Sequence, residues 1–208
     1  MIKNIKKNIS LYDNESNENV KDTLLNSNKS FGMWIYLMSD SIIFAVLFAM
    51  YVIIASNIPI NFISNKIFNL YFVLLETFVL LISSLSCGFI VIAMNQKNIK
   101  MIFSFLLITF CLGSVFLFME LNEFYDLILK DCSPDKHAFF SIFFTLVGTH
   151  GIHVLFGLIF ILSIFYQIKK LGLTNSICTR ILCFNMFWHF LDIIWICVFT
   201  FVYLSGAV

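Results

Sequence analysis

The stretch "FWHFLDIIWICVF", residues 187–199, places one histidine, one aspartate and two tryptophans in an otherwise apolar segment. On a helix, His189 and Asp192 lie three positions apart and therefore on one face. Trp188, Asp192 and Trp195 form a second helical stripe, with spacings of four and three. Burial of a polar group without a partner costs roughly 2–7 kcal/mol. The stretch therefore predicts a helix whose polar side chains meet partners on other helices.

The composition of the whole chain indicates an integral membrane protein. Of its 208 residues, 60% are hydrophobic and 12% are charged, and 26 are phenylalanine. Soluble domains carry roughly twice that charged share, about 25%. The net charge is +1 and no long acidic or basic block occurs, so nothing indicates a nucleic-acid partner. The six cysteines include no Cys-x-x-Cys pair, so neither a disulfide nor a thiolate metal site is expected.

Five apolar runs are each long enough to cross a membrane. A helix needs about 20 apolar residues to span the hydrocarbon layer. The runs do not alternate between polar and apolar residues as barrel strands do, so they are expected to be helices. The sequence predicts an all-α, polytopic membrane bundle with a single membrane domain over residues 31–208. The five transmembrane helices are expected at about 31–55, 66–94, 101–124, 138–167 and 181–204.

The distribution of lysine and arginine predicts the orientation. Positive residues are retained on the cytoplasmic side of a membrane protein. Residues 1–30 are polar and lack the apolar core of a signal peptide, so they are expected to form a flexible cytoplasmic tail. The amino terminus is then cytoplasmic and the carboxyl terminus periplasmic. Ten basic residues fall on the cytoplasmic side, at 3, 6, 7, 21, 29, 97, 100, 169, 170 and 180, and three on the other side, at 66, 130 and 136.

Polar side chains on four of the five predicted helices converge on one depth. At a rise of 1.5 Å per residue, the first polar residue of each helix lies roughly 12–18 Å from the start of that helix, near the middle of the membrane. Glycines 148, 151 and 157 flank two of them and allow neighbouring helices to approach closely. Glu120 and Glu123 are expected nearer the outer surface and solvated. The expected polar layer comprises Asp40, Glu76, His150, His153, His189 and Asp192.

Three functions are compatible with this layer. His150, His153 and His189 could ligate haem or a metal ion, although few histidines are present. Asp40 and Glu76 could relay protons or ions, as acids inside membranes often do. The third interpretation is structural: paired polar groups satisfy one another, fix the helix register and line an internal cleft. Trp188 and Trp195 would then line that cleft or pack in the core.

Four stretches, in order, resemble motifs of subunit III of the haem–copper respiratory oxidases. In the first two stretches, Asp40 stands at the place of the family's membrane acid and Glu76 lies on the next helix. The third resembles the family signature His-Gly-x-His-Val-x-x-Gly and the fourth resembles Trp-His-Phe-x-Asp-x-x-Trp. The resemblance runs from about residue 31 to 208. The four stretches are "FGMWIYLMSD" (31–40), "LLETFVLLISS" (74–84), "GTHGIHVLFG" (148–157) and "WHFLDIIWICVF" (188–199).

Within the family, the chain looks most like the bo-type ubiquinol oxidase branch. Five helices, a polar amino-terminal tail and an outside carboxyl terminus resemble that branch, whereas many cytochrome c oxidase versions have seven helices. The resemblance implies a non-catalytic subunit of a proton-pumping quinol oxidase in the bacterial inner membrane. Subunit III of a cytochrome c oxidase is the alternative, and a free-standing transporter or membrane haem protein is an alternative of another class.

The resemblance also implies partners and cofactors. The chain is expected to assemble with oxidase subunits I, II and IV. Haem and copper are expected in subunit I and none in this chain. A V-shaped cleft is expected to bind phospholipid, and the chain is expected to support the stability and proton uptake of the catalytic subunit. Asp40, Glu76, His150, His153, Trp188, His189, Asp192 and Trp195 would line this cleft or lock the helices together.

Overall fold

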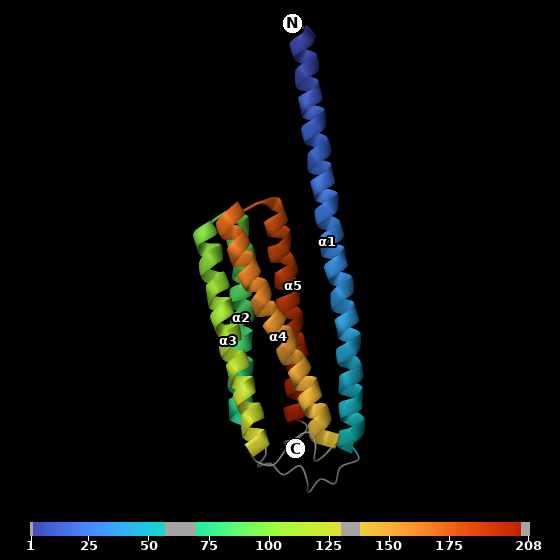
Figure 1. Cartoon of the computed structure of the whole chain (residues 1–208), viewed down its shortest axis with the longest axis vertical. Coiled ribbons are helices and arrows are strands. Elements are labelled where there is room, and N and C mark those ends of the chain that lie inside the picture. The colour runs from blue at the N-terminus through green and yellow to red at the C-terminus, as the bar shows by residue number, and fades with distance from the viewer. Residues whose placement is uncertain (1, 57–69, 130–137, 205–208) are drawn as a thin grey trace.

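The computed structural model describes residues 2–56, 70–129 and 138–204, and these fold into helices (Figure 1). Within those ranges the backbone contains no strand. The last helix ends in a wider π-helical segment. The helices are α1 (Ile2–Ser56), α2 (Leu70–Asn95), α3 (Ile99–Leu129), α4 (Ala138–Leu171), α5 (Asn175–Val198) and the π-helix η2 (Phe199–Leu204).

Five of these segments are long and apolar enough to cross a membrane, so the predicted fold class is confirmed. In the described part of the chain each predicted run coincides with one observed span to within a few residues. The first and third connections, with Pro59 and Pro134, lie outside the described residues, as do residues 205–208. The observed spans are Ser27–Ser56, Tyr71–Asn95, Ile99–Leu129, Ala138–Leu171 and Asn175–Leu204.

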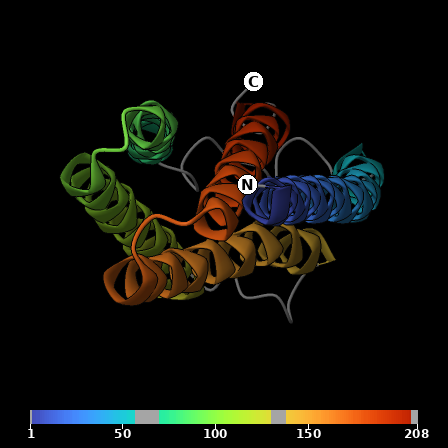
Figure 2. The ribbon, with the colours of Figure 1, turned by 90° about the horizontal axis from the view of Figure 1, so that it is seen from above.

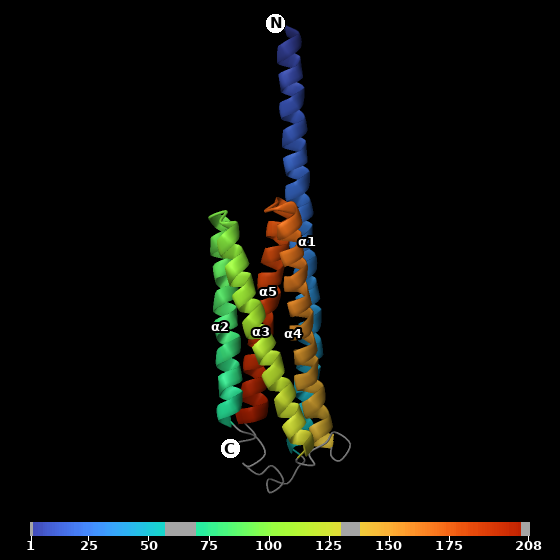
Figure 3. The same ribbon diagram turned by 60° about the vertical axis from the view of Figure 1, so that its left-hand side comes forward.

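Helix α1 begins earlier than the sequence predicted. Its backbone is helical from Ile2 and not from residue 31, and its amino-terminal part extends beyond the ends of the other four helices (Figures 1 and 3). Residues 2–30 contain neither proline nor glycine, so nothing in them breaks a helix. The apolar span within α1 begins only at Ser27. The flexibility of residues 1–30 stays a prediction.

Helix α5 occupies the centre of the bundle. It packs against α1, α2 and α4, while α3 packs against α2 and α4 (Figure 2). The two described connections lie at the end where Lys29 Nζ donates to Ser176 Oγ at 3.4 Å. Gly172, with φ +68°, ends α4, and its N–H donates to the carbonyl of Ile168, an arrangement that favours glycine.

Close approach of three helices depends on Trp188 packing between two glycines. A Cβ atom on Gly113 of α3 would lie 2.8 Å from Cη2 of Trp188, and one on Gly157 of α4 would lie 2.8 Å from its Cζ3. Any larger residue would therefore collide with the indole ring. The two glycines let α3 and α4 close on α5, and this contact fixes the position of the polar side chains along α5.

Candidate functional site

Two buried tryptophans join α5 to α2. Nε1 of Trp188 donates to Ser83 Oγ at 3.0 Å, and Nε1 of Trp195 donates to Thr77 Oγ1 at 3.1 Å. Both indoles are buried, and an indole N–H in an apolar environment needs such an acceptor. From the sequence, these residues could either line a cleft or pack in the core. Their burial favours core packing.

A second polar contact between α5 and α2 involves His189. Its Nδ1 lies 2.8 Å from Ser84 Oγ and 3.8 Å from Asp192 Oδ2. Asp192 is buried, whereas the side chain of His189 is 42% exposed. The predicted pairing of His189 with Asp192 on one helical face is therefore observed at long range. The closer partner, Ser84, comes from another helix.

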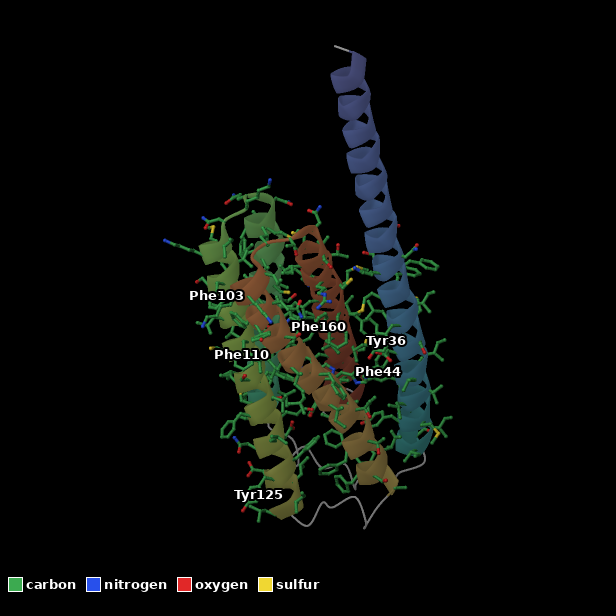
Figure 4. All side chains as sticks on the ribbon, turned by 45° about the horizontal axis from the view of Figure 1, so that its top comes forward. Tyr36, Phe44, Phe103, Phe110, Tyr125 and Phe160 are labelled. Carbon is green, nitrogen blue, oxygen red and sulfur yellow. The ribbon has the colours of Figure 1, made fainter. Side chains whose placement is uncertain are left out.

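Asp40 pairs with His153 and thereby connects α1 to α4. Asp40 Oδ2 lies 3.5 Å from His153 Nε2, and both side chains are largely buried. His153 Nδ1 lies 2.7 Å from the carbonyl of Thr149, which can only accept, so Nδ1 is the donor. Phe44, one turn after Asp40 on the inner side of α1, packs against the imidazole (Figure 4). The contact covers a polar pair with an aromatic ring.

His150 lies three residues before His153 but faces different helices. It is completely buried, with its ring centroid 5.1 Å from that of Trp195 and 5.9 Å from that of Phe116. Neither ring nitrogen makes a hydrogen bond to a described residue. His150 therefore packs α4 against α5 and α3, whereas His153 packs α4 against α1.

A cluster of carboxyl groups lies nearer the end of the bundle. The Tyr203 hydroxyl in η2 donates to Glu123 Oε2 at 2.8 Å. Glu76 and Glu120 lie close enough to interact electrostatically with each other or with Glu123. Glu120 is 2% exposed and lies over Gly151, whose Cβ would meet Glu120 Oε1 at 2.8 Å. We call Glu76, Glu120, Glu123 and Tyr203 the carboxylate cluster.

Glu120 is buried, so the prediction that it lies in solvent is wrong. Its depth along α3 is near the carboxyl-terminal end of the helix, but the helical face that carries it points into the bundle. Gly113, Phe116 and Glu120 follow one another at spacings of three and four, and all three are buried. This helical pattern, together with a glycine on the facing helix, was the signal that could have found the buried acid.

The contacts divide the predicted polar layer into separate groups. Asp40 meets His153, while Glu76 belongs to the carboxylate cluster; His189 meets Ser84. In residues 2–56, 70–129 and 138–204, no group of three or more histidine, cysteine, aspartate or glutamate side chains is arranged to hold a metal ion. The absence of haem and metal from this chain stays a prediction.

Nearly the whole chain matches one known protein family. Residues 10–207 match the model of the family described as cytochrome c oxidase subunit III. The chain belongs to the cytochrome c oxidase subunit III family. The four motifs that pointed to this family carry Asp40, Glu76, His153 and Trp188, which all make contacts between helices or belong to the carboxylate cluster.

Relatives within the subunit III family are similar along most of their length. Cytochrome bo(3) ubiquinol oxidase subunit 3 of Buchnera aphidicola subsp. Acyrthosiphon pisum is 72% identical over 193 residues, covering 93% of this chain and 94% of the relative. The protein of the same name from Pseudomonas aeruginosa is 45% identical and covers 86% of each chain. Quinol oxidase subunit 3 of Bacillus subtilis is 38% identical, and the match covers 84% of this chain and 86% of the relative. This member of the family is a multi-pass protein of the bacterial inner membrane.

Replacing Glu120 with glutamine tests the carboxylate cluster in this subunit III chain. Burial of a carboxyl group without a hydrogen-bond partner is costly, above all in its charged form, and a second carboxyl group nearby adds to that cost. Glutamine keeps the shape of glutamate but removes one of the interacting carboxyl groups. We expect Glu120→Gln to raise the unfolding temperature in detergent by about 2–4 °C, the equivalent of about 1 kcal/mol for a chain of this size. Asp126→Asn, at an exposed position on the same helix, should leave it unchanged. A lower unfolding temperature for Glu120→Gln would contradict this account.

Proposed function

We propose that this chain is the non-catalytic subunit III of a proton-pumping terminal ubiquinol oxidase in the aerobic respiratory chain. In this complex quinol is oxidised and oxygen is reduced to water by companion subunits. The observation that carries the proposal is the 72% identity, over 93% of the chain, to a relative named as subunit 3 of a ubiquinol oxidase. The names of the relatives favour quinol over cytochrome c as the electron donor.

The geometry supports a structural function for this chain within the complex. The indole N–H groups of Trp188 and Trp195 donate to hydroxyl groups on α2. The buried pair of Asp40 and His153 connects α1 to α4. Such contacts fix helix positions and satisfy polar groups that would otherwise be unpaired in the membrane. We propose that haem and copper belong to subunit I, that this chain holds neither, and that subunits II and IV complete the assembly.

Two further properties belong to the same proposal. The amino terminus is cytoplasmic, which is supported by Lys97, Lys100, Lys169 and Lys170 lying at the helix ends that face the Lys29 side of the bundle. Phospholipid binds along the bundle, which is supported by the many exposed apolar side chains of its helices. By holding its helices in one arrangement, the chain supports the stability and proton uptake of subunit I.

Purification of a tagged chain tests the proposed function. Expressed together with its companion genes, the tagged chain should recover a haem-bearing complex that oxidises ubiquinol with oxygen uptake. Expressed alone, it should show no stoichiometric Soret band and no copper. Cells with the untagged chain provide the control. A tagged chain that brings down no haem-bearing subunit, or that binds haem by itself, would overturn the proposal and favour the haem-protein alternative.

A further inference from the structure

Helix α5 has one face that the other helices leave uncovered. α2 lies on one side of this face and α1 on the other, while α4 packs across the opposite side of α5 (Figure 2). The uncovered residues recur at spacings of four and three, as the positions along one helical stripe do. We call this stripe the α5 face; Leu182, Ile193, Ile196 and Thr200 in it are exposed, while Met186 and His189 are half-buried.

His189 lies in the middle of the α5 face. It is fourteen residues from Asn175 and fifteen from Leu204, the ends of this span. At a rise of 1.5 Å per residue, His189 lies about 21 Å from either end of the span. Because half the hydrocarbon layer is only about 15 Å thick, His189 lies near the middle of the membrane, with the ends of the span beyond the layer. Ser84, its partner, is likewise near the middle of the span Tyr71–Asn95. The exposed imidazole is therefore at the depth where a membrane is least polar.

The hydrogen bonding of His189 is incomplete. Nδ1 is occupied by Ser84, but Nε2 makes no hydrogen bond to any described residue. Asp192, next to it, is 5% exposed, and its carboxylate faces His189 Nδ1 and Ser84, with Oδ2 3.8 Å from Nδ1. Acyl chains cannot supply a hydrogen-bond partner for Nε2, so this exposed imidazole points to a polar group that approaches from outside the chain.

The adjoining surface of α2 permits the close approach of another helix. Gly88 lies one helical turn after Ser84, and nothing lies within 4 Å of the position its Cβ would occupy. Small residues spaced by four let two membrane helices come close enough for side chains to hydrogen-bond. A lipid headgroup could also bind a histidine, but headgroups lie about 15 Å from the depth of His189. The depth thus favours a protein helix over a lipid.

We infer that the α5 face binds a transmembrane helix of another oxidase subunit, which presents a hydrogen-bonding side chain to Nε2 of His189. This inference rests on the proposed function, because it requires a companion subunit in the membrane. The ring of His189 is held by Ser84, so the interacting atom has a fixed position. The apolar residues above and below it, Leu182 and Ile193, pack against the same partner helix.

Photo-crosslinking within the intact complex tests the inference directly. The photoreactive residue p-benzoylphenylalanine is placed at Ile193, which is 61% exposed, one turn beyond His189. Irradiation of the membranes should join this chain to a second polypeptide, which mass spectrometry identifies. The same residue at Phe156, equally exposed on α4, sets the background yield. Adducts at Ile193 that contain phospholipid alone would overturn the inference.

Substitution of His189 provides a second test. His189→Phe removes the hydrogen bond and keeps an aromatic ring, so the chain should be lost from the complex about three- to thirtyfold more readily in a detergent challenge, the effect of one interhelical hydrogen bond in a membrane. His189→Gln should restore most of the retention, and Ile193→Leu should match the parent chain. Equal retention of the phenylalanine variant and the parent would refute the inference. If the parent itself recovers no haem-bearing subunit, the proposed function fails instead.

Discussion

Replacing Gly157 with leucine is expected to remove nearly all folded chain from the membrane. A Cβ atom at this position would lie 2.8 Å from Cζ3 of Trp188 and 3.2 Å from Cε1 of Phe187. The indole cannot swing away, because Gly113 contacts its other edge and Ser83 accepts its N–H. Overpacking a tight core costs roughly 1–3 kcal/mol, and separating three helices should cost about 3 kcal/mol or more. Quantitative immunoblotting of membranes and thermal unfolding of the purified complex measure the effect.

The matched control for this variant is Gly32→Ala. Nothing lies within 4 Å of the Cβ position of Gly32, and alanine is a better helix former than glycine by about 1 kcal/mol. This variant should accumulate at least as well as the parent. Adding Trp188→Phe to Gly157→Leu should restore part of the yield, because the smaller ring vacates the space that leucine needs. A Gly157→Leu chain as abundant and stable as the control would show that Trp188 does not fix the approach of α4.

The Asp40–His153 pair should show strong coupling in a double-mutant cycle. His153→Leu leaves the buried carboxyl group of Asp40 without its imidazole, and breaking a buried pair in this way costs about 3–5 kcal/mol. Asp40→Leu removes the other partner and should also destabilise the chain. The double variant replaces both groups with apolar side chains and should lose less stability than the sum of the two single variants.

Denaturant unfolding of the purified complex measures the four free energies of this cycle. The coupling free energy should exceed about 1 kcal/mol, which lies within the range of about 0.5–3 kcal/mol that is usual for residues in contact. Asp126→Asn combined with His153→Leu provides the control, because Asp126 lies on the exposed surface of α3 and its effect should add to that of His153→Leu. Simple additivity of Asp40→Leu and His153→Leu would mean that the pair does not hold α1 against α4.

Hydrophobic run lengths and motif order were sufficient to predict five membrane helices and the family. The length of an apolar run can be read from the local sequence. Such a run forms a helix in the membrane because its backbone must make its own hydrogen bonds there. Helical spacing also correctly placed His189 and Asp192 together. The start of α1 was missed because a polar segment without proline or glycine shows no boundary signal.

The pairing of polar groups across helices could not be read from spacing. Asp40 meets His153 and His189 meets Ser84 because of how the helices are rotated and tilted in the bundle. Two residues three positions apart differ by about 60° around a helix, which is enough for His150 and His153 to contact different neighbours. Serine and threonine are common in membrane helices, so Ser84 carried no signal before its partner was seen.

The packing of α1 has a consequence for synthesis on the ribosome. This first helix contacts mainly α4 and α5, which are the last to be made. At about 5–20 residues per second, the 113 positions between Asp40 and His153 take on the order of ten seconds to translate. During that interval the carboxyl group of Asp40 lacks its partner, the imidazole of His153. We therefore expect α1 to reach its final position only after α4 and α5 have been made.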